Sequence, residues 1–170
     1  GIVRHEDNTK MSKSSGNAID PLDIIKVYSA DILRFTLAMT TPKGLDVKIS
    51  IKTFDIGMEF CTKFWNAIRY CMINIKEEVS IDFDSYKDEL NGIDRWIINK
   101  LNNVVEFIGK SFDNYDFSKA TRTIYDFIWN DFCNTYLELI KPRIINGDKV
   151  TMNILATVLE ALTRILHPII

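Results

Sequence analysis

The chain has 170 residues, of which 46% are apolar and 26% charged, a balance typical of one globular domain or of parts of two. Its formal net charge of −2 excludes a strong overall basic field that would attract nucleic acid by charge alone. No apolar run approaches the ~18 residues that a membrane span needs, and the N-terminal GIVRHEDNTK lacks the apolar core of a signal peptide.

The three cysteines, Cys61, Cys71 and Cys133, have no metal-ligand spacing and lie within apolar helical patterns. We therefore expect reduced, buried thiols and a cytoplasmic protein without a structural metal. The chain lacks an initiator Met and stops within the apolar run LHPII, which indicates a fragment of a longer protein.

The first 50 residues predict a polar loop followed by two short helices. Asp20 and Pro21 suit the start of one helix, because Asp caps the first free N–H groups and Pro fits the first helical position. Ser29 is a candidate cap for a second helix, SADILRFTLAM. Pro42 and Gly44 then interrupt the helical pattern, and DVKIS is expected to be short and extended.

Four longer helices are predicted from apolar residues spaced three and four apart. The first begins near Ser50 and carries a main stripe and a second set that widens it: Phe54, Met58, Cys61, Trp65, Ile68, Met72 and Ile75, then Phe60, Phe64, Ala67 and Cys71. The acidic stretch KEEVSIDFDSYKDEL is expected to be an irregular loop.

The second long helix is predicted over residues 93–112, the third over 118–140 and the fourth over 151–166. Their apolar positions are, in turn, Ile93, Ile97, Leu101, Val104, Ile108 and Phe112; Ile124, Ile128, Phe132, Tyr136 and Leu139; and Leu155, Val158, Leu162 and Ile165. Pro142 is expected to end the third helix before a turn at Asn146-Gly147-Asp148. The expected fold is mainly α, an antiparallel helical bundle over residues 51–170 joined to a separate segment over 1–50.

The stretch KMSKSSGN, residues 10–17, has the chemistry of a phosphate-binding loop. Lys10 and Lys13 supply two cations, Ser12 and Ser14 supply hydroxyl donors, and Gly16 permits a tight turn. The stretch does not have the G-x-x-x-x-G-K-[ST] spacing of a P-loop. From composition alone, such a Lys/Ser loop is more often a solvated surface loop than a binding site.

The order of these residues resembles the signature loop of class I aminoacyl-tRNA synthetases. Within that class, IDPLDIIKVYSADILRF, TTPKGLDVKIS and FWNAIRY resemble the valyl group, as do the later segments DRWIINKLN, YDFIWNDFCNTYLELIKP and ILHPII. Two positions depart from that group's pattern. Ser15 replaces a common Leu, and Thr135 replaces a common aromatic residue, which weakens any contact role for that helix face.

The resemblance implies a valine–tRNA ligase, in which valine is activated with ATP, pyrophosphate leaves, and the acyl group passes to the terminal ribose of tRNA(Val). It implies that Lys13 and Lys10 are catalytic cations. It also implies that Met11 packs near the adenine and that Ser12 and Ser14 contact phosphate or hold the loop, with Mg²⁺ accompanying ATP. No HIGH-type motif, nucleotide-binding sheet or editing domain occurs in these residues, so activation by this segment alone is not expected.

The resemblance further implies that the helical bundle binds the anticodon region of tRNA and that the protein is a monomer without membrane association. The candidate RNA-contacting residues are Arg34, Arg95, Trp96 and Arg122, because RNA loops are held by aromatic planes and by cations on phosphate. Two alternatives stay open: an isoleucyl or other close class I synthetase, and a helical interaction module whose Lys/Ser loop is only a linker.

Overall fold

The computed structural model describes residues 1–75 and 78–170 and is mainly α-helical, as predicted. Its residues pack into two compact units. The first contains Gly1–Thr62, Phe107–Thr123 and Ile169–Ile170, and the second contains Lys63–Glu106 and Ile124–Pro168. The division predicted at residue 50 stays a prediction. No helix among the described residues is sufficiently long and apolar to cross a bilayer.

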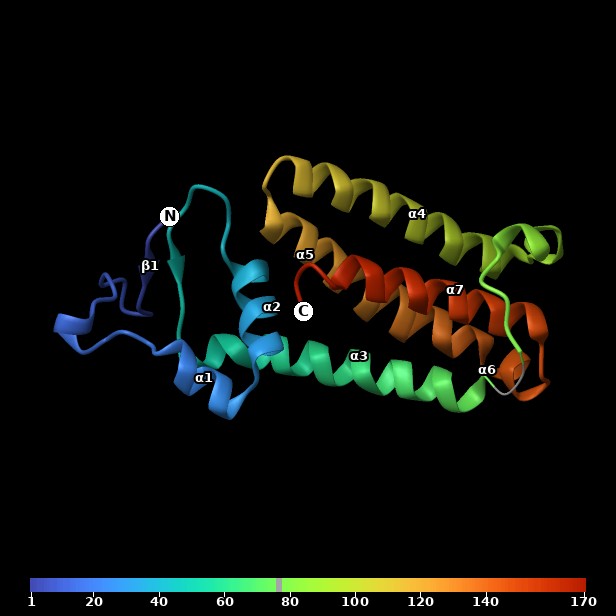
Figure 1. The fold of residues 1–170 in the computed structure, drawn as a ribbon, viewed down its shortest axis with the longest axis horizontal. Helices are drawn as coiled ribbons and strands as arrows, with labels where there is room; N and C mark the ends of the chain where they lie inside the picture. The colour runs from blue at the N-terminus through green and yellow to red at the C-terminus, as the bar shows by residue number, and fades with distance from the viewer. Residues whose placement is uncertain (76–77) are drawn as a thin grey trace. The chain divides into compact units, whose positions relative to one another are not determined.

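In the first unit, two short strands pair in parallel (Figure 1). Strand β1 (Val3–Arg4) lies beside β2 (Val47–Lys48), with Val3 opposite Val47 and Arg4 opposite Lys48. Asp46 strengthens this pairing, because its carboxylate accepts hydrogen bonds from Ile2 N at 2.8 Å and from Arg4 Nε at 2.7 Å. The extended DVKIS segment is thus confirmed, whereas its partner strand is too short for a recognisable sequence pattern.

Helices α1 (Pro21–Val27) and α2 (Ala30–Thr40) begin at the predicted caps. The Asp20 side chain accepts from Leu22 N, and the Ser29 side chain accepts from Ile32 N. Both caps satisfy backbone donors that a helix leaves free at its first turn. The two helices and β2 close a small core, whose buried members are Ile24, Ile32, Val47, Ile49 and Phe54.

Helix α3 (Phe54–Asn74) follows a short turn, η2 (Ile51–Thr53), but buries a different face from the predicted stripe. Met58, Trp65 and Met72 are 41%, 68% and 65% exposed, so the main stripe is wrong at these positions. Phe54 of the main stripe is buried, and so are all the residues that were expected only to widen it: Phe60, Phe64, Ala67 and Cys71.

Gly57 explains part of this difference. A β-carbon at Gly57 would lie 2.3 Å from Thr36 Oγ1 and 3.0 Å from Ile32 O, so α2 passes directly against this glycine. Phe35 of α2 also stacks on Phe60, with ring centroids 4.1 Å apart. Close packing on the Gly57–Phe60 side turns Met58 outward, and apolar periodicity alone does not distinguish two apolar faces of one helix.

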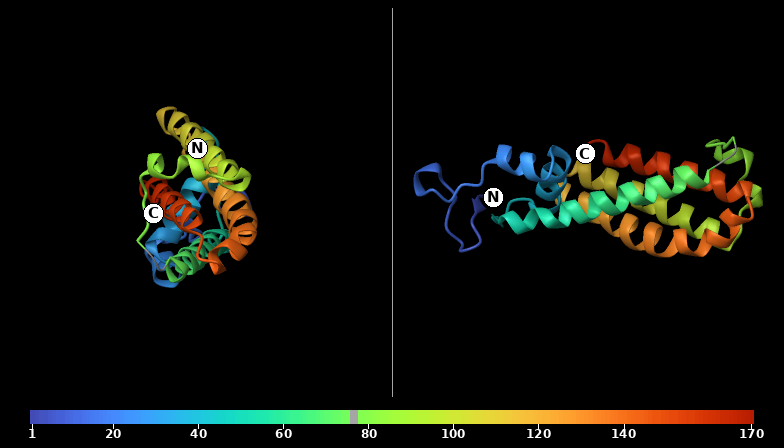
Figure 2. Two further views of the ribbon diagram at one scale, coloured as in Figure 1. Left: turned by 90° about the vertical axis from the view of Figure 1, so that its right-hand side faces the viewer. Right: turned by 90° about the horizontal axis from the view of Figure 1, so that it is seen from below.

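In the second unit, helical segments lie side by side and run alternately in opposite directions (Figures 1 and 2). They are the last part of α3, the first part of α4 (Gly92–Asp113), the chain from Ile124 through α6 (Leu137–Ile145), and α7 (Lys149–Leu166). The predicted α4 and α7 helices are confirmed within a few residues. Ile97, Leu101, Leu155, Val158 and Leu162 are buried in the bundle as expected.

The predicted third helix is a continuous run of three parts: α5 (Phe117–Asp126), the π-helical segment η5 (Phe127–Tyr136) and α6. One row of its buried positions falls at every fourth residue: Ile124, Ile128, Phe132, Tyr136, Ile140 and Ile144. An α-helix has about 3.6 residues per turn, so such a series would drift around it. A π-helix has i→i+5 hydrogen bonds and more residues per turn, so positions four apart turn around its axis in the opposite direction. The two shifts compensate along this run, and the series stays on one face of the helix.

Two expectations for this run are wrong. Leu139 is half exposed and Ile140 is buried in its place, because the π-helical segment shifts the register of the stripe. Pro142 does not end the helix, which continues to Ile145. Pro142 lies in the last turns of α6, where its missing N–H removes only one late hydrogen bond. The turn at Asn146–Gly147–Asp148 is confirmed, with Gly147 at φ 72°.

The segment between α3 and α4 is irregular, as predicted for its described part; Lys76 and Glu77 lie outside the described residues. It contains two short 3₁₀ turns, η3 (Phe83–Ser85) and η4 (Lys87–Glu89). Tyr86 anchors the segment, because its ring is buried and its hydroxyl lies 2.6 Å from Thr157 Oγ1 of α7.

The cysteines are free thiols. Cys71 is buried, and Cys61 and Cys133 are partly buried. Burial raises the pKa of the Cys71 thiol to about 12, and the pKa values of Cys61 and Cys133 to about 11. These thiols are therefore protonated and weakly nucleophilic near neutral pH. The expected burial is complete for Cys71 and only partial for Cys61 and Cys133.

Candidate functional site

The KMSKSSGN loop leaves the strand pair and returns to α1, and the loop projects from the first unit (dark blue in Figures 1 and 2). Arg4 forms an isolated antiparallel bridge with Lys10, and Met11 N donates to Val3 O at 3.4 Å. The start of the loop is therefore tied to β1 by backbone contacts. The rest of the loop is exposed or half exposed.

The hydroxyl groups of the loop form a compact cluster. Ser12 Oγ lies 3.2 Å from Ser14 Oγ and 2.7 Å from Ser15 Oγ, and it accepts from Ser15 N at 3.2 Å. Residues Lys13–Ser15 form a single 3₁₀ turn that Gly16 closes at φ 66°, a left-handed conformation that glycine adopts without steric cost. The turn presents Lys13 and Ser14 together at the surface.

Asn17 is the internal anchor of this loop, a role that the sequence reasoning did not assign. Its Oδ1 accepts from Ser12 N at 2.9 Å, and its Nδ2 donates to Thr9 Oγ1 at 3.0 Å and to Lys10 O at 3.3 Å. One amide side chain thus joins both arms of the loop. The available signal was the Gly-Asn pair, since an Asn amide offers both donors and acceptors to a turn.

Lys10 and Lys13 are exposed, and their ammonium groups form no ion pair or hydrogen bond with any residue in the described ranges. The loop is flanked by two hollows. One of about 410 Å³ is lined by Lys13, Gly16 and the start of α1, and one of about 400 Å³ includes His5, Asn17 and Lys52. Two cations and a cluster of hydroxyl and N–H donors beside open volume can bind a phosphate chain.

Met11 is oriented differently from the two lysines. Its side chain is partly buried against the core of Ile24, Ile32 and Phe54. This packing holds the loop to the first unit through an apolar contact. A contact of Met11 with adenine stays a prediction.

Arg34 and Arg122 lie in the first unit and are exposed. Arg34 Nε donates to Ile169 O at 3.1 Å, and its Nη2 pairs with Asp31. Arg122 Nε donates to Met39 O at 3.1 Å. Each guanidinium is held by a backbone carbonyl and keeps further N–H groups at the surface, since an arginine has five donors.

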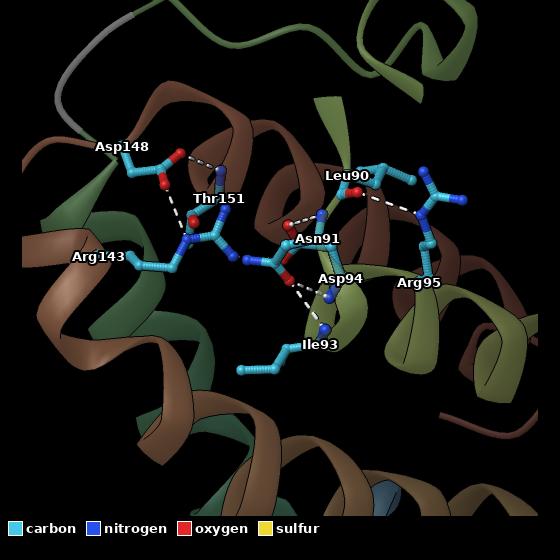
Figure 3. Close-up of polar contacts among 8 residues, drawn as sticks. All are labelled: Leu90, Asn91, Ile93, Asp94, Arg95, Arg143, Asp148 and Thr151. Carbon is cyan, nitrogen blue, oxygen red and sulfur yellow. Dashed lines mark hydrogen bonds and ion pairs between the residues drawn. The ribbon is translucent and has the colours of Figure 1, made fainter. Parts of the chain in front are cut away.

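Arg95 and Trp96 lie near the start of α4 in the second unit. Arg95 is exposed and its Nε donates to Leu90 O at 3.1 Å, whereas Trp96 is half buried. Figure 3 shows the Arg95 side chain pointing away from a neighbouring ionic network. Arg95 is therefore available at the surface, and its role in RNA binding stays a prediction.

The network beside it joins the beginnings of two helices to the end of a third (Figure 3). Arg143 of α6 donates from Nη1 to Asp94 Oδ1 at 2.6 Å and from Nε to Asp148 Oδ2 at 2.7 Å. Asp94 is fully buried, and Asp148 caps α7 by accepting from Thr151 N at 3.1 Å. These residues serve the packing of the bundle, because their charges are already paired.

The described residues contain no group of three or more His, Cys, Asp or Glu side chains that would hold a metal ion.

Comparison with known proteins identifies the family. Two protein-family models match the chain. The model described as "tRNA synthetases class I (I, L, M and V)" matches residues 1–50, and the model described as "Anticodon-binding domain of tRNA ligase" matches residues 94–170. Valine–tRNA ligase of Thermotoga maritima is 41% identical over 98% of this chain, and that of Mycolicibacterium paratuberculosis is 42% identical over 100%. The chain belongs to the valine–tRNA ligase family.

The family assignment covers one segment of such an enzyme, because the chain spans 19% of the length of both relatives. The fold agrees with two solved class I synthetases. One is the LeuRS in the Agrobacterium radiobacter K84 agnB2 LeuRS-tRNA-LeuAMS ternary complex, with a TM-score of 0.80 and 21% identity over 99% of this chain and 20% of that one. The other is Mycobacterium tuberculosis methionyl-tRNA synthetase with methionyl-adenylate, with a TM-score of 0.77 and 19% identity over 98% and 34% of the two chains.

Proposed function

We propose that this chain supplies two parts of a valine–tRNA ligase: a phosphate-binding loop for ATP and a helical bundle that binds the anticodon region of tRNA(Val). The observation that carries the proposal is the pair of exposed ammonium groups of Lys10 and Lys13, which no described residue neutralises, on a loop held together by Asn17. Membership of the valine–tRNA ligase family supports valine as the amino acid.

The proposed chemistry is acyl activation followed by transfer. An oxygen of the valine carboxylate forms a bond to the α-phosphorus of ATP, the bond from that phosphorus to the β-phosphate oxygen breaks, and pyrophosphate leaves. A ribose hydroxyl of tRNA then takes the acyl group and AMP leaves. Lys13 and Lys10 act in the first step, as cations beside the phosphates on which negative charge accumulates.

The serine hydroxyls and Asn17 have a supporting role in this proposal. Ser12 forms hydrogen bonds with Ser14, Ser15 and Asn17 within the loop. These bonds fix the backbone that carries the two lysines. A preformed array of donors avoids the cost of reorganising polar groups as charge develops. Mg²⁺ is expected to accompany ATP, but the described residues provide no protein site for it and no step here depends on it. The proposed location is the cytoplasm and the proposed state a monomer.

The experiment that tests the loop is Lys13→Ala in the complete ligase. Loss of one donor at the developing charge typically costs about 3 kcal/mol, so ATP–pyrophosphate exchange should fall on the order of a hundredfold. The matched control is Lys26→Ala. Lys26 is exposed but its ammonium already pairs with Asp23 at 2.8 Å. If Lys13→Ala and Lys26→Ala exchange at the same rate, the loop does not have the proposed role.

A further inference from the structure

The corner between α4 and α5, residues 107–123 of the first unit, carries a group of cations that the proposed function does not use. Lys110, Lys119 and Arg122 are exposed in this segment, against Asp113 and Asp116. Lys43 joins them, since its Nζ donates to Asn114 O at 2.7 Å. Four cations against two carboxylates make this corner locally basic in a chain whose net charge is −2.

The same corner has a hollow of about 360 Å³, lined by Phe107, Lys110, Ser111, Asn114, Asp116 and Lys119. Lys119 Nζ lies 4.9 Å from the centroid of the Phe107 ring, a cation–π distance that holds this ammonium over the ring. The Ser111 hydroxyl is satisfied by Phe107 O at 2.9 Å and so belongs to the helix itself. The hollow is thus walled by one aromatic ring and bordered by two lysines.

Tyr115 is the most informative residue of the corner. Its ring is 73% exposed, and its backbone has φ 55°, a left-handed conformation that is costly for a bulky residue. The backbone around it is a helix-ending turn in which Asp116 N donates to Ser111 O at 2.8 Å and Tyr115 N to Phe112 O at 2.9 Å. Glycine is the usual residue at such a position.

The stability of the fold therefore does not explain why a tyrosine occupies position 115. The ring is instead presented to solvent and steadied by an edge contact with Phe117, with centroids 6.4 Å apart. An exposed, positioned aromatic ring beside several cations suits a ligand with both negative charge and flat rings. RNA has both features, in its phosphates and its unpaired bases.

We propose that the α4–α5 corner is an RNA-contacting surface, on which Lys43, Lys110 and Lys119 contact phosphates and Tyr115 stacks on an unpaired base. The proposal rests on the proposed function, which supplies tRNA as the RNA. It differs from the residues named from the sequence, because only Arg122 of that set lies in this corner. An acidic protein is the competing partner and is separated by the test.

The test measures the dissociation constant of tRNA(Val) for the complete ligase by fluorescence anisotropy over a series of salt concentrations. For Lys110→Glu with Lys119→Glu, loss of two phosphate contacts should weaken binding by about tenfold or more. It should also reduce the slope of log K against log salt by about 2. The control is Lys26→Glu with Lys48→Glu, which changes the charge equally at exposed lysines of the first unit outside the corner.

A second variant separates binding from folding. Tyr115→Gly removes the ring and relieves the left-handed strain, so the protein should be at least as stable while tRNA binding weakens about tenfold. The proposal that this corner contacts RNA would be overturned if tRNA binding were unchanged in both corner variants, or if the control pair lost as much affinity. Binding of an acidic protein at the corner would not rescue it. A wild-type enzyme without tRNA affinity would instead overturn the proposed function.

Discussion

Arg143 forms an ion pair with Asp94, a carboxylate that is fully buried. Burial by itself lowers the pKa of Arg143, but hydrogen bonds and charge from Asp94 and Asp148 outweigh it and raise that pKa. The Tyr136 hydroxyl is buried near these charges and makes no hydrogen bond with any described residue, and burial, with the Asp94 charge, raises its pKa. An intact Arg143 side chain is therefore required for the charge on Asp94 to be tolerated.

We expect Arg143→Leu to lower the free energy of unfolding by about 3–5 kcal/mol, because it leaves the buried Asp94 carboxylate without its cationic partner. Urea denaturation followed by circular dichroism measures this change. The control is Arg164→Leu, whose surface pair with Glu160 should be worth less than about 1 kcal/mol. Equal losses in the two variants would show that the Asp94 charge does not depend on Arg143.

The residue scale also shows which parts of the site were predictable. Lys10, Lys13, Ser12 and Ser14 were named from their residue types and from the family resemblance. The structure places all four on one surface loop, and their contacts with ATP stay a prediction. Asn17 was missed, because its three hydrogen bonds depend on a fold of the loop that spacing does not reveal. Tyr115 was missed for a related reason, since a positive φ is visible only in three dimensions.

At the scale of elements, apolar periodicity predicted where the helices lie, and the residue types of Asp20 and Ser29 predicted two of their caps. Periodicity predicted the buried faces of the helices less well. Helix α3 has apolar residues over most of its circumference, so Gly57 and its close contact with α2 decided which side is buried. The run from Phe117 to Ile145 contains a π-helical segment, which a pattern based on α-helical spacing does not detect. Pro142 misled the prediction because it lies near enough to the helix end to be tolerated.

We expect Gly57→Ala to destabilise the protein by about 1–3 kcal/mol, because the new methyl group would meet Ile32 O and Thr36 Oγ1. Thermal denaturation measures the effect. Gly109→Ala is the matched control, since Gly109 also lies in a helix but has no atom within 4 Å of the added carbon. The control should gain up to about 1 kcal/mol from higher helix propensity. Similar shifts for both variants would contradict the close approach of α2 to α3.

At the scale of the whole molecule, both units contain carboxylates that stabilise the fold only when ionised. In the first unit, two hydrogen bonds lower the pKa of Asp46. The larger effect comes from the backbone N–H of Ile2 and the next from the Arg4 side chain. In the second unit, burial raises the pKa of Asp148, but the hydrogen bonds from Arg143 and from Thr151 N outweigh it and the pKa is lowered. A lowered folded pKa means that the stabilisation is complete above the unfolded pKa of about 3.9 and is lost below it.

We therefore expect the free energy of unfolding to decrease as the pH falls below about 4, through the lowered pKa values of these two carboxylates. Urea denaturation at a series of pH values measures this dependence. In Asp148→Asn, the starting stability should be lower and the decrease with acid should be shallower, because one of the two groups no longer titrates. Parallel curves for the variant and the wild type would exclude Asp148 as a contributor.

The strand pair has a topological consequence for the loop. Because Val3–Arg4 lies against Val47–Lys48, everything between these residues is a ring of chain closed by hydrogen bonds rather than by a covalent link. A single protease cut at the exposed Ser14–Ser15 bond would open the ring. The pairing of Val3–Arg4 with Val47–Lys48 would still hold the two fragments together. The nicked protein would keep both fragments, so the cut would be detected by denaturing electrophoresis and not by the loss of a fragment from the native protein.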